Sequence, residues 1–191
     1  DWRKLNHLAP KRYRSIFHQL SREPDRIEKV FNLFDHSYLE FLVSAFQSYL
    51  WNEVARDFLR RFVKDGFDLS YFLGKFYFYH KMIDRYKSYQ IPIINHKTVI
   101  DDRVLLEIYD KVLGNLCLSQ RSLRIKWPER LRVKSFNRSL ISWPNFSKVD
   151  IIEDKYFPGK RGLLLGFSLS AGSYATLLIK RLIGPKAGLN I

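Results

Sequence analysis

Between residues 41 and 63, apolar residues recur every three or four positions, over the longest unbroken stretch of this kind in the chain. Side chains with that spacing share one face of an α-helix. A capping box of Ser37 and Glu40 is expected at its start, and Gly66 is expected to end it. We therefore predict a long helix over Phe41–Val63, called the spine helix. Its apolar face would comprise Leu39, Leu42, Val43, Phe46, Leu50, Val54, Phe58 and Phe62.

Further patterns predict helices before residue 130 and mainly strands after it. The aromatic-rich stretch 67–89 is interpreted as one or two helices on the spine, and helical spacing resumes over 101–118. Alternation over 131–135 predicts a strand with one basic face. Next come a β-hairpin, with strands Val149–Tyr156 and Gly162–Leu169, and a helix over Tyr174–Ile183. The expected fold class is α+β.

Charge and composition favour a polyanionic partner. The 191 residues carry a formal charge of +14, and 16% of them are aromatic. The segment from Arg121 to Lys148 contains eight basic residues and only one acidic residue, Glu129. Such a balance favours nucleic acid over a membrane, and no apolar run approaches the roughly twenty residues of a membrane helix. The single Cys117 excludes an internal disulfide, fits a reducing compartment, and is expected to be buried by packing.

Candidate chemistry is sparse. Histidines are scattered without metal-ligand spacing, and neither a phosphate-binding loop nor a nucleophile motif is present. The pair Asp101-Asp102 precedes a helix, where the helix dipole explains acidic residues. From the residues alone, we expect a basic α+β chain suited to RNA, with no metal site and no evident active site.

Two motifs add a resemblance. Ser44-Ala-Phe-Gln-Ser-Tyr-Leu-Trp-Asn52 lies in the spine, and Phe167-Ser-Leu-Ser-Ala-Gly-Ser-Tyr-Ala-Thr176 lies near the end. In this order, and with Leu140-Ile-Ser-Trp-Pro144 between them, they resemble the TruD family of tRNA pseudouridine synthases. Gln47 stands where many members have arginine, and Ser170 stands where the family motif has proline.

The resemblance implies a division into two parts. Residues 1–130 would be a mainly helical TruD-type insertion domain, and residues 131–191 would be the C-terminal strands and helix of the catalytic domain. The family's aspartate motif, G-x-K-D-x-x-A-x-T-x-Q, occurs nowhere in the sequence. No catalytic residue is therefore expected here. The chain is expected to be the C-terminal portion of a synthase, inactive alone, that needs an upstream segment to supply the aspartate.

The implied reaction is the isomerisation of uridine to pseudouridine in the D-arm region of tRNA, of the uridine-13 type, with the target base flipped out of its stack. Tyr174 is expected to line the pocket together with Gly172 and Ser173. Expected partners are tRNA and the missing N-terminal part of the catalytic domain, with no membrane, no DNA and a cytoplasmic location. Candidate phosphate contacts are Arg124, Arg130, Arg132, Lys134, Arg138, Lys160 and Arg161.

Two other functions stay open at this stage. The chain can be a non-catalytic RNA-binding module that has kept the substrate-gripping half. It can also be a basic helical interaction protein with no RNA role.

Overall fold

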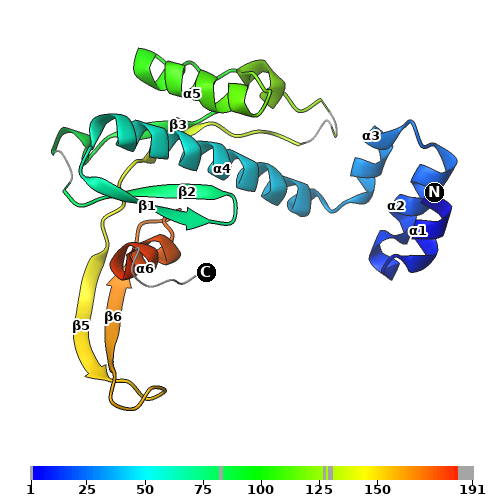
Figure 1. The fold of residues 1–191 in the computed structure, drawn as a ribbon. Coiled ribbons are helices and arrows are strands. Elements are labelled where there is room, and N and C mark those ends of the chain that lie inside the picture. The colour runs from blue at the N-terminus through cyan, green and yellow to red at the C-terminus, as the bar shows by residue number, and fades with distance from the viewer. Residues whose placement is uncertain (1, 82–83, 127, 129–130, 185–191) are drawn as a thin grey trace. The chain divides into compact units, whose positions relative to one another are not determined.

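The computed structural model describes residues 2–81, 84–126, 128 and 131–184. It contains helices and antiparallel strand pairs, which confirms the predicted α+β class (Figure 1). The helices are α1 (Trp2–Leu8), α2 (Arg14–Arg22), α3 (Ile27–Val30), α4 (His36–Phe62), α5 (Arg103–Asn115) and α6 (Ala175–Ile183). Short 3-10 turns are η1 (Lys11–Tyr13), η2 (Phe31–Leu33), η3 (Asp84–Tyr86) and η4 (Gln120–Leu123). The strands are β1 (Gly66–Tyr71), β2 (Gly74–Tyr79), β3 (Gln90–Ile93), β4 (Phe136–Ser139), β5 (Asn145–Glu153) and β6 (Arg161–Ser168).

The chain forms two compact units. One comprises residues 1–54 and 92–137, and the other comprises residues 55–91 and 138–191. The strands pair as β1 with β2, β3 with β4, and β5 with β6, each as a two-stranded sheet. The predicted division at residue 130 stays a prediction.

Helix α4 confirms the predicted spine and extends it to His36. Its start differs from the expected capping box, because the Asp35 carboxylate accepts from the amides of Ser37 (2.8 Å) and Tyr38 (3.4 Å). The hydrogen bond from the Ser37 hydroxyl, and then these two from the backbone amides, hold the pKa of Asp35 below its usual range. The aspartate caps the helix two residues before the predicted serine and satisfies amides of the first turn in the same chemical way.

The aromatic stretch after the spine is a β-hairpin, so its interpretation as helices over 67–89 is wrong. Strand β1 pairs with β2 from Gly66 opposite Tyr79 to Tyr71 opposite Gly74. The rings of Tyr71 and Phe76 stack with centroids 4.1 Å apart. Polar and apolar residues alternate in β1, which is the two-residue period of a strand. Aromatic residues also favour strands, so this segment does not form the predicted helix.

Helix α5 confirms the predicted helix and the structural interpretation of its acidic pair. Asp102 caps it by accepting from the amides of Val104 (2.8 Å) and Leu105 (3.2 Å). The Tyr109 hydroxyl donates to the carbonyl of Pro92. Burial of that hydroxyl raises its pKa.

Cys117 is exposed, which contradicts the prediction that packing buries it. It follows the end of α5 with a φ of 55°, a backbone conformation that turns the chain away from the helix.

Strands β5 and β6 confirm the predicted hairpin, and α6 confirms the predicted last helix. Val149 lies opposite Leu165 and Ile151 lies opposite Leu163, with a register shift between Phe146 and Lys148. Every residue of β5 is exposed. Figure 1 shows the pair as a ribbon with no third described strand beside it.

Candidate nucleic-acid interface

The segment 131–135, called the basic arm, is held to its unit without strand pairing. Its predicted strand is wrong, because β4 begins only at Phe136 and the arm's carbonyls accept from side-chain amides. Asn95 Nδ2 donates to the carbonyl of Val133 (3.2 Å), and Gln47 Nε2 donates to the carbonyl of Lys134 (2.6 Å). These bonds replace part of the backbone ladder that a neighbouring strand would supply.

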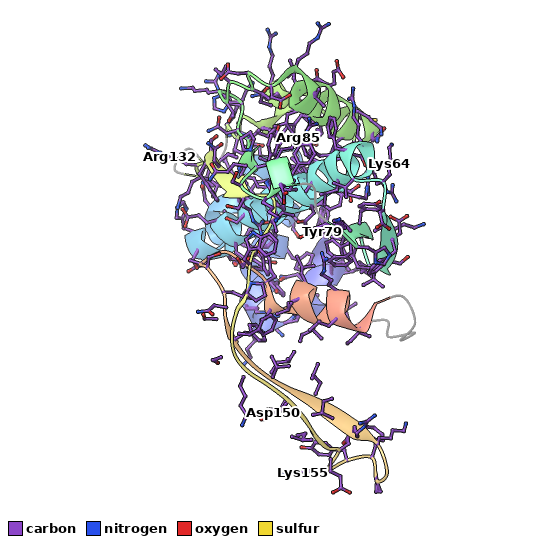
Figure 2. All side chains as sticks on the ribbon, turned by 90° about the vertical axis from the view of Figure 1, so that its left-hand side faces the viewer. Lys64, Tyr79, Arg85, Arg132, Asp150 and Lys155 are labelled. Carbon is purple, nitrogen blue, oxygen red and sulfur yellow. The ribbon has the colours of Figure 1, made fainter. Side chains whose placement is uncertain are left out.

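The alternation that suggested a strand still sorts the arm's side chains. Leu131 is only 8% exposed and Val133 is half-buried, whereas Arg132 and Lys134 are exposed. Figure 2 labels Arg132 at this segment. An extended backbone places alternate side chains on opposite sides, so the two cations share the solvent side. The arm therefore presents positive charge over an anchored backbone.

A second basic segment is tied to the same loop. Gln120 Nε2 donates to the carbonyls of Asn95 (2.9 Å) and Thr98 (2.6 Å), which fixes η4 against residues 95–98. Arg124 follows η4 and is exposed. Of the predicted phosphate contacts, Arg124, Arg132 and Lys134 thus lie on segments joined through one loop. Arg130 lies outside the described residues.

The predicted pocket residues surround the start of α6. Tyr174 is its N-cap residue and is half exposed. The guanidinium carbon of Arg138 lies 5.2 Å from the centre of the Tyr174 ring, and Arg138 Nη2 donates to the carbonyl of Gly172 (3.0 Å). Burial lowers the pKa of Arg138, partly offset by Tyr174, yet a guanidinium stays charged at neutral pH. Arg138 therefore orients the ring and the loop together.

Serine hydroxyls close the same loop. Ser173 Oγ lies 2.7 Å from Ser142 Oγ and 3.0 Å from Ser170 Oγ. The Ser173 amide donates to the carbonyl of Ser170 (3.1 Å), so this amide is already engaged within the loop. Gly172 has a φ of 83°, which a residue with a Cβ rarely adopts. The loop before α6 is thus a defined turn that holds Tyr174 at an exposed position.

Lys160 and Arg161 lie at the opposite end of the hairpin from α6. Lys160 Nζ lies 5.3 Å from the centre of the Phe157 ring, and Arg161 is paired across the strands with Glu153. The length of β6, roughly 25 Å at about 3.3 Å per residue, separates them from the Tyr174 loop. The structure therefore does not bring all the predicted contacts into one patch.

Two contacts were missed by the sequence analysis. The Arg181 guanidinium carbon lies 4.1 Å from the centre of the Tyr79 ring, which joins α6 to β2. Gln47 is buried and bonds two carbonyls. The family resemblance marks Gln47 as a departure from the family pattern, but neither it nor the local sequence indicates these partners.

The described residues contain no group of three or more His, Cys, Asp or Glu side chains placed to hold a metal. Within the same ranges, no helix combines the length and apolar character needed to cross a membrane. Candidate carboxylates have structural partners: Asp102 caps α5, and Asp154 accepts from the amides of Tyr156 (2.8 Å) and Phe157 (3.1 Å) in the hairpin turn.

Known proteins are similar to this chain in sequence and in fold. No protein-family model matches the chain. A Methanococcus maripaludis protein assigned as tRNA pseudouridine synthase D 1 is 29% identical over 184 residues, which cover 91% of this chain and 46% of that protein. A Methanocaldococcus jannaschii protein assigned as tRNA pseudouridine synthase D 2 is 28% identical over 95% of this chain and 45% of that protein. The tRNA pseudouridine synthase D of Leptospira interrogans is 28% identical over 89% of this chain and 44% of its own length.

A solved structure supports the fold. The Methanosarcina mazei crystal structure assigned as tRNA pseudouridine synthase D (TruD) matches with a TM-score of 0.68 and 19% identity, over 95% of this chain and 47% of that one. The chain therefore spans about half the length of the relatives it matches.

Proposed function

Because the chain belongs to the TruD family of tRNA pseudouridine synthases, we propose that it is part of an enzyme that isomerises uridine to pseudouridine in tRNA. The observation that carries this proposal is the match of nine tenths of the chain to proteins named for that activity. We further propose that the target is a D-arm uridine of the uridine-13 type and that the enzyme works in the cytoplasm.

The reaction breaks the bond between the ribose and a uracil nitrogen, turns the base, and forms a bond from the ribose to a uracil carbon. It needs one carboxylate and no cofactor. The described carboxylates Asp102 and Asp154 are engaged as caps, so neither is free for this work. We propose that the catalytic aspartate lies in an upstream segment, because the family's aspartate motif is absent from this sequence, and we expect this chain alone to be inactive.

The chain's own part is to hold the substrate. A stacked base cannot be reached, so it must be flipped, and an exposed ring is a natural support for it. Tyr174, oriented by Arg138 and the Gly172–Ser173 turn, is proposed to line that pocket. The phosphate contacts are proposed to be Arg124, Arg130, Arg132, Lys134, Lys160 and Arg161, with Arg138 acting through the ring and the loop.

The exposed faces of the hairpin β5–β6 support the proposal that another protein segment, from the same or a separate chain, packs on it to complete the catalytic domain. On one face Val149 with Leu165 and Ile151 with Leu163 form an apolar surface, and Ile151 is 68% exposed. The other face carries exposed Leu164 beside the ion pair of Lys148 and Asp150 (3.2 Å). Figure 2 shows the side chains along this ribbon, with Asp150 and Lys155 labelled. Apolar residues on both faces are typical of a strand that is covered on both sides.

The test joins the chain in frame to the N-terminal half of the Methanococcus maripaludis relative and assays tRNA by chemical mapping of pseudouridine. Modification is expected for the fusion. It should be lost when the aspartate of the K-D-x-x-A-x-T motif becomes asparagine. The chain alone should leave tRNA unmodified. Modification by the chain alone would contradict the proposal that an upstream segment supplies the catalytic aspartate. Specific tRNA binding with no activity in any fusion would favour the non-catalytic RNA-binding module instead.

A further inference from the structure

Gln47 is a buried polar residue in the middle of the long helix α4, with 6% of its surface exposed. Its side-chain nitrogen donates to two backbone carbonyls, those of Ile94 (2.9 Å) and Lys134 (2.6 Å). An amide nitrogen has two hydrogens, and a carbonyl can only accept. The two donors and the two acceptors therefore fix the orientation of the amide.

These bonds connect three parts of one unit. Gln47 lies on α4, Ile94 follows β3, and Lys134 belongs to the basic arm, 87 residues along the chain from Gln47. A neighbouring tie runs from Asn95 Nδ2 to the carbonyl of Val133. With Leu131 buried at one end of the arm, the amides fix the other end.

The carbonyl that Gln47 holds belongs to a residue whose own side chain points to solvent. Lys134 is exposed, as is Arg132 two residues earlier. Like charges repel each other, and long basic side chains lose conformational freedom when they bind. An arm whose backbone is already ordered loses less entropy when its cations meet phosphates.

We propose that Gln47 is a positioning residue for tRNA binding: its amide fixes the basic arm so that Arg132 and Lys134 engage backbone phosphates. The proposal rests on the proposed function, since it takes tRNA as the ligand. Gln47 itself touches no substrate and acts through the backbone of Lys134.

The test compares Gln47→Met with a matched variant, Tyr109→Phe. Methionine keeps the length and volume of the side chain but removes both donors. Tyr109→Phe also removes one buried hydrogen bond to a carbonyl in the same unit, but it leaves the arm untouched. Both variants should lower the melting temperature. Only Gln47→Met should weaken tRNA binding, by about two- to tenfold, which corresponds to the lost freedom of about one side chain.

A double-mutant comparison separates positioning from general damage. Arg132→Gln with Lys134→Gln removes the charges that Gln47 is proposed to place. Adding Gln47→Met to that pair should weaken tRNA binding no further, because no charge remains to be positioned. Additive losses, or an affinity equal to wild type for Gln47→Met, would overturn the proposal.

A readout without RNA tests the arm directly. Trypsin cleaves after Arg132 and Lys134, and cleavage there should be faster in Gln47→Met than in Tyr109→Phe at equal distance below each melting temperature. Equal rates would overturn the proposal. If Gln47→Met does not fold, Asn95→Ala at a half-buried site removes the neighbouring tie and should show the same pattern. If the wild-type chain shows no salt-dependent tRNA binding, the proposed function fails, while the cleavage result still decides whether Gln47 fixes the basic arm.

Discussion

The basic arm and the hairpin β5–β6 are both alternating stretches, yet they complete their structures in opposite ways. The arm buries its apolar residue Leu131 but has side-chain amides for partners instead of a neighbouring strand. The hairpin pairs its two strands over most of their length but leaves apolar residues such as Ile151 exposed. Backbone pairing and side-chain burial are therefore separate requirements, and an alternating sequence does not say which one the chain itself will meet.

The difference follows from where the partners lie in the sequence. The hairpin's two strands are joined by a short turn, so their hydrogen bonds form locally. The arm's partners lie on α4 and on the loop after β3, tens of residues away. Local strand pairing therefore forms without distant residues, whereas cover for the apolar side chains depends on residues outside the hairpin.

The largest expected effect compares the two apolar residues. Leu131→Ala should lower the free energy of unfolding by about 2–5 kcal/mol, because it leaves a cavity under the arm. Ile151→Ala should change it by less than about 0.5 kcal/mol, because its side chain is already in water. Urea denaturation of the chain measures both. A large loss for Ile151→Ala would show that the hairpin is covered within the chain.

Backbone packing within the hairpin gives the next effect. A Cβ on Gly166 would lie 2.9 Å from Ser147 Oγ and 3.1 Å from Lys148 Cβ. Gly166→Ala should therefore cost about 1 kcal/mol as the register shift near Lys148 adjusts. At Gly162 the same Cβ would meet Ile152 Cγ1 at an ordinary 3.6 Å, so Gly162→Ala is the matched control. Equal thermal stability of the two variants would mean that the strand pairing is looser than described.

Removing the charged groups of the arm and of the hairpin should affect RNA binding to different degrees. Neither removal should change the free energy of unfolding by more than about 0.5 kcal/mol. Replacing Arg132 and Lys134 by glutamine should reduce the salt dependence of tRNA binding by about two phosphate contacts. Replacing Lys160 and Arg161 should reduce it by about one, because Arg161 lies opposite Glu153. Titrations of labelled tRNA at several salt concentrations measure both slopes. A larger effect at the hairpin would reverse the ranking of the two regions.

The smallest effect concerns the start of the helix that carries Gln47. The pKa of Asp35 is held below its usual range by hydrogen bonds from Ser37 and Tyr38. Its contribution to stability is therefore complete above the unfolded pKa, about 4, and is lost as the pH falls through the lower folded value. Asp35→Asn keeps a capping oxygen without the titration, so its melting temperature should depend less on pH between about pH 4 and 2. Parallel pH profiles would contradict this assignment.

Long periodic elements could be predicted from the sequence. The spine helix, the helix after Asp102, the hairpin and the last helix all appear, because each is defined by residues close together in the chain. The errors have physical causes. The density of aromatic residues over 67–89 suggests a helix, but Phe67, Leu69 and Tyr71 alternate with polar residues and form a strand. The strand expected at 131–135 begins only at Phe136.

The candidate site was predictable in composition but not in arrangement. Exposed Arg124, Arg132 and Lys134 follow from local charge and alternation. Their common attachment through Asn95, Gln120 and Gln47 does not, because side-chain amides that reach distant carbonyls leave no periodic trace. The contact of Arg138 with Tyr174 is likewise a tertiary contact between residues 36 positions apart.

The ribbon of β5 and β6 has two outer edges with no described strand beside them, and most of its Val, Ile and Leu side chains lie exposed. Such edges are templates for identical chains to add to one another. We expect the chain to self-associate through these edges when it is purified alone. Light scattering that rises with protein concentration would be the outward sign of that open ribbon.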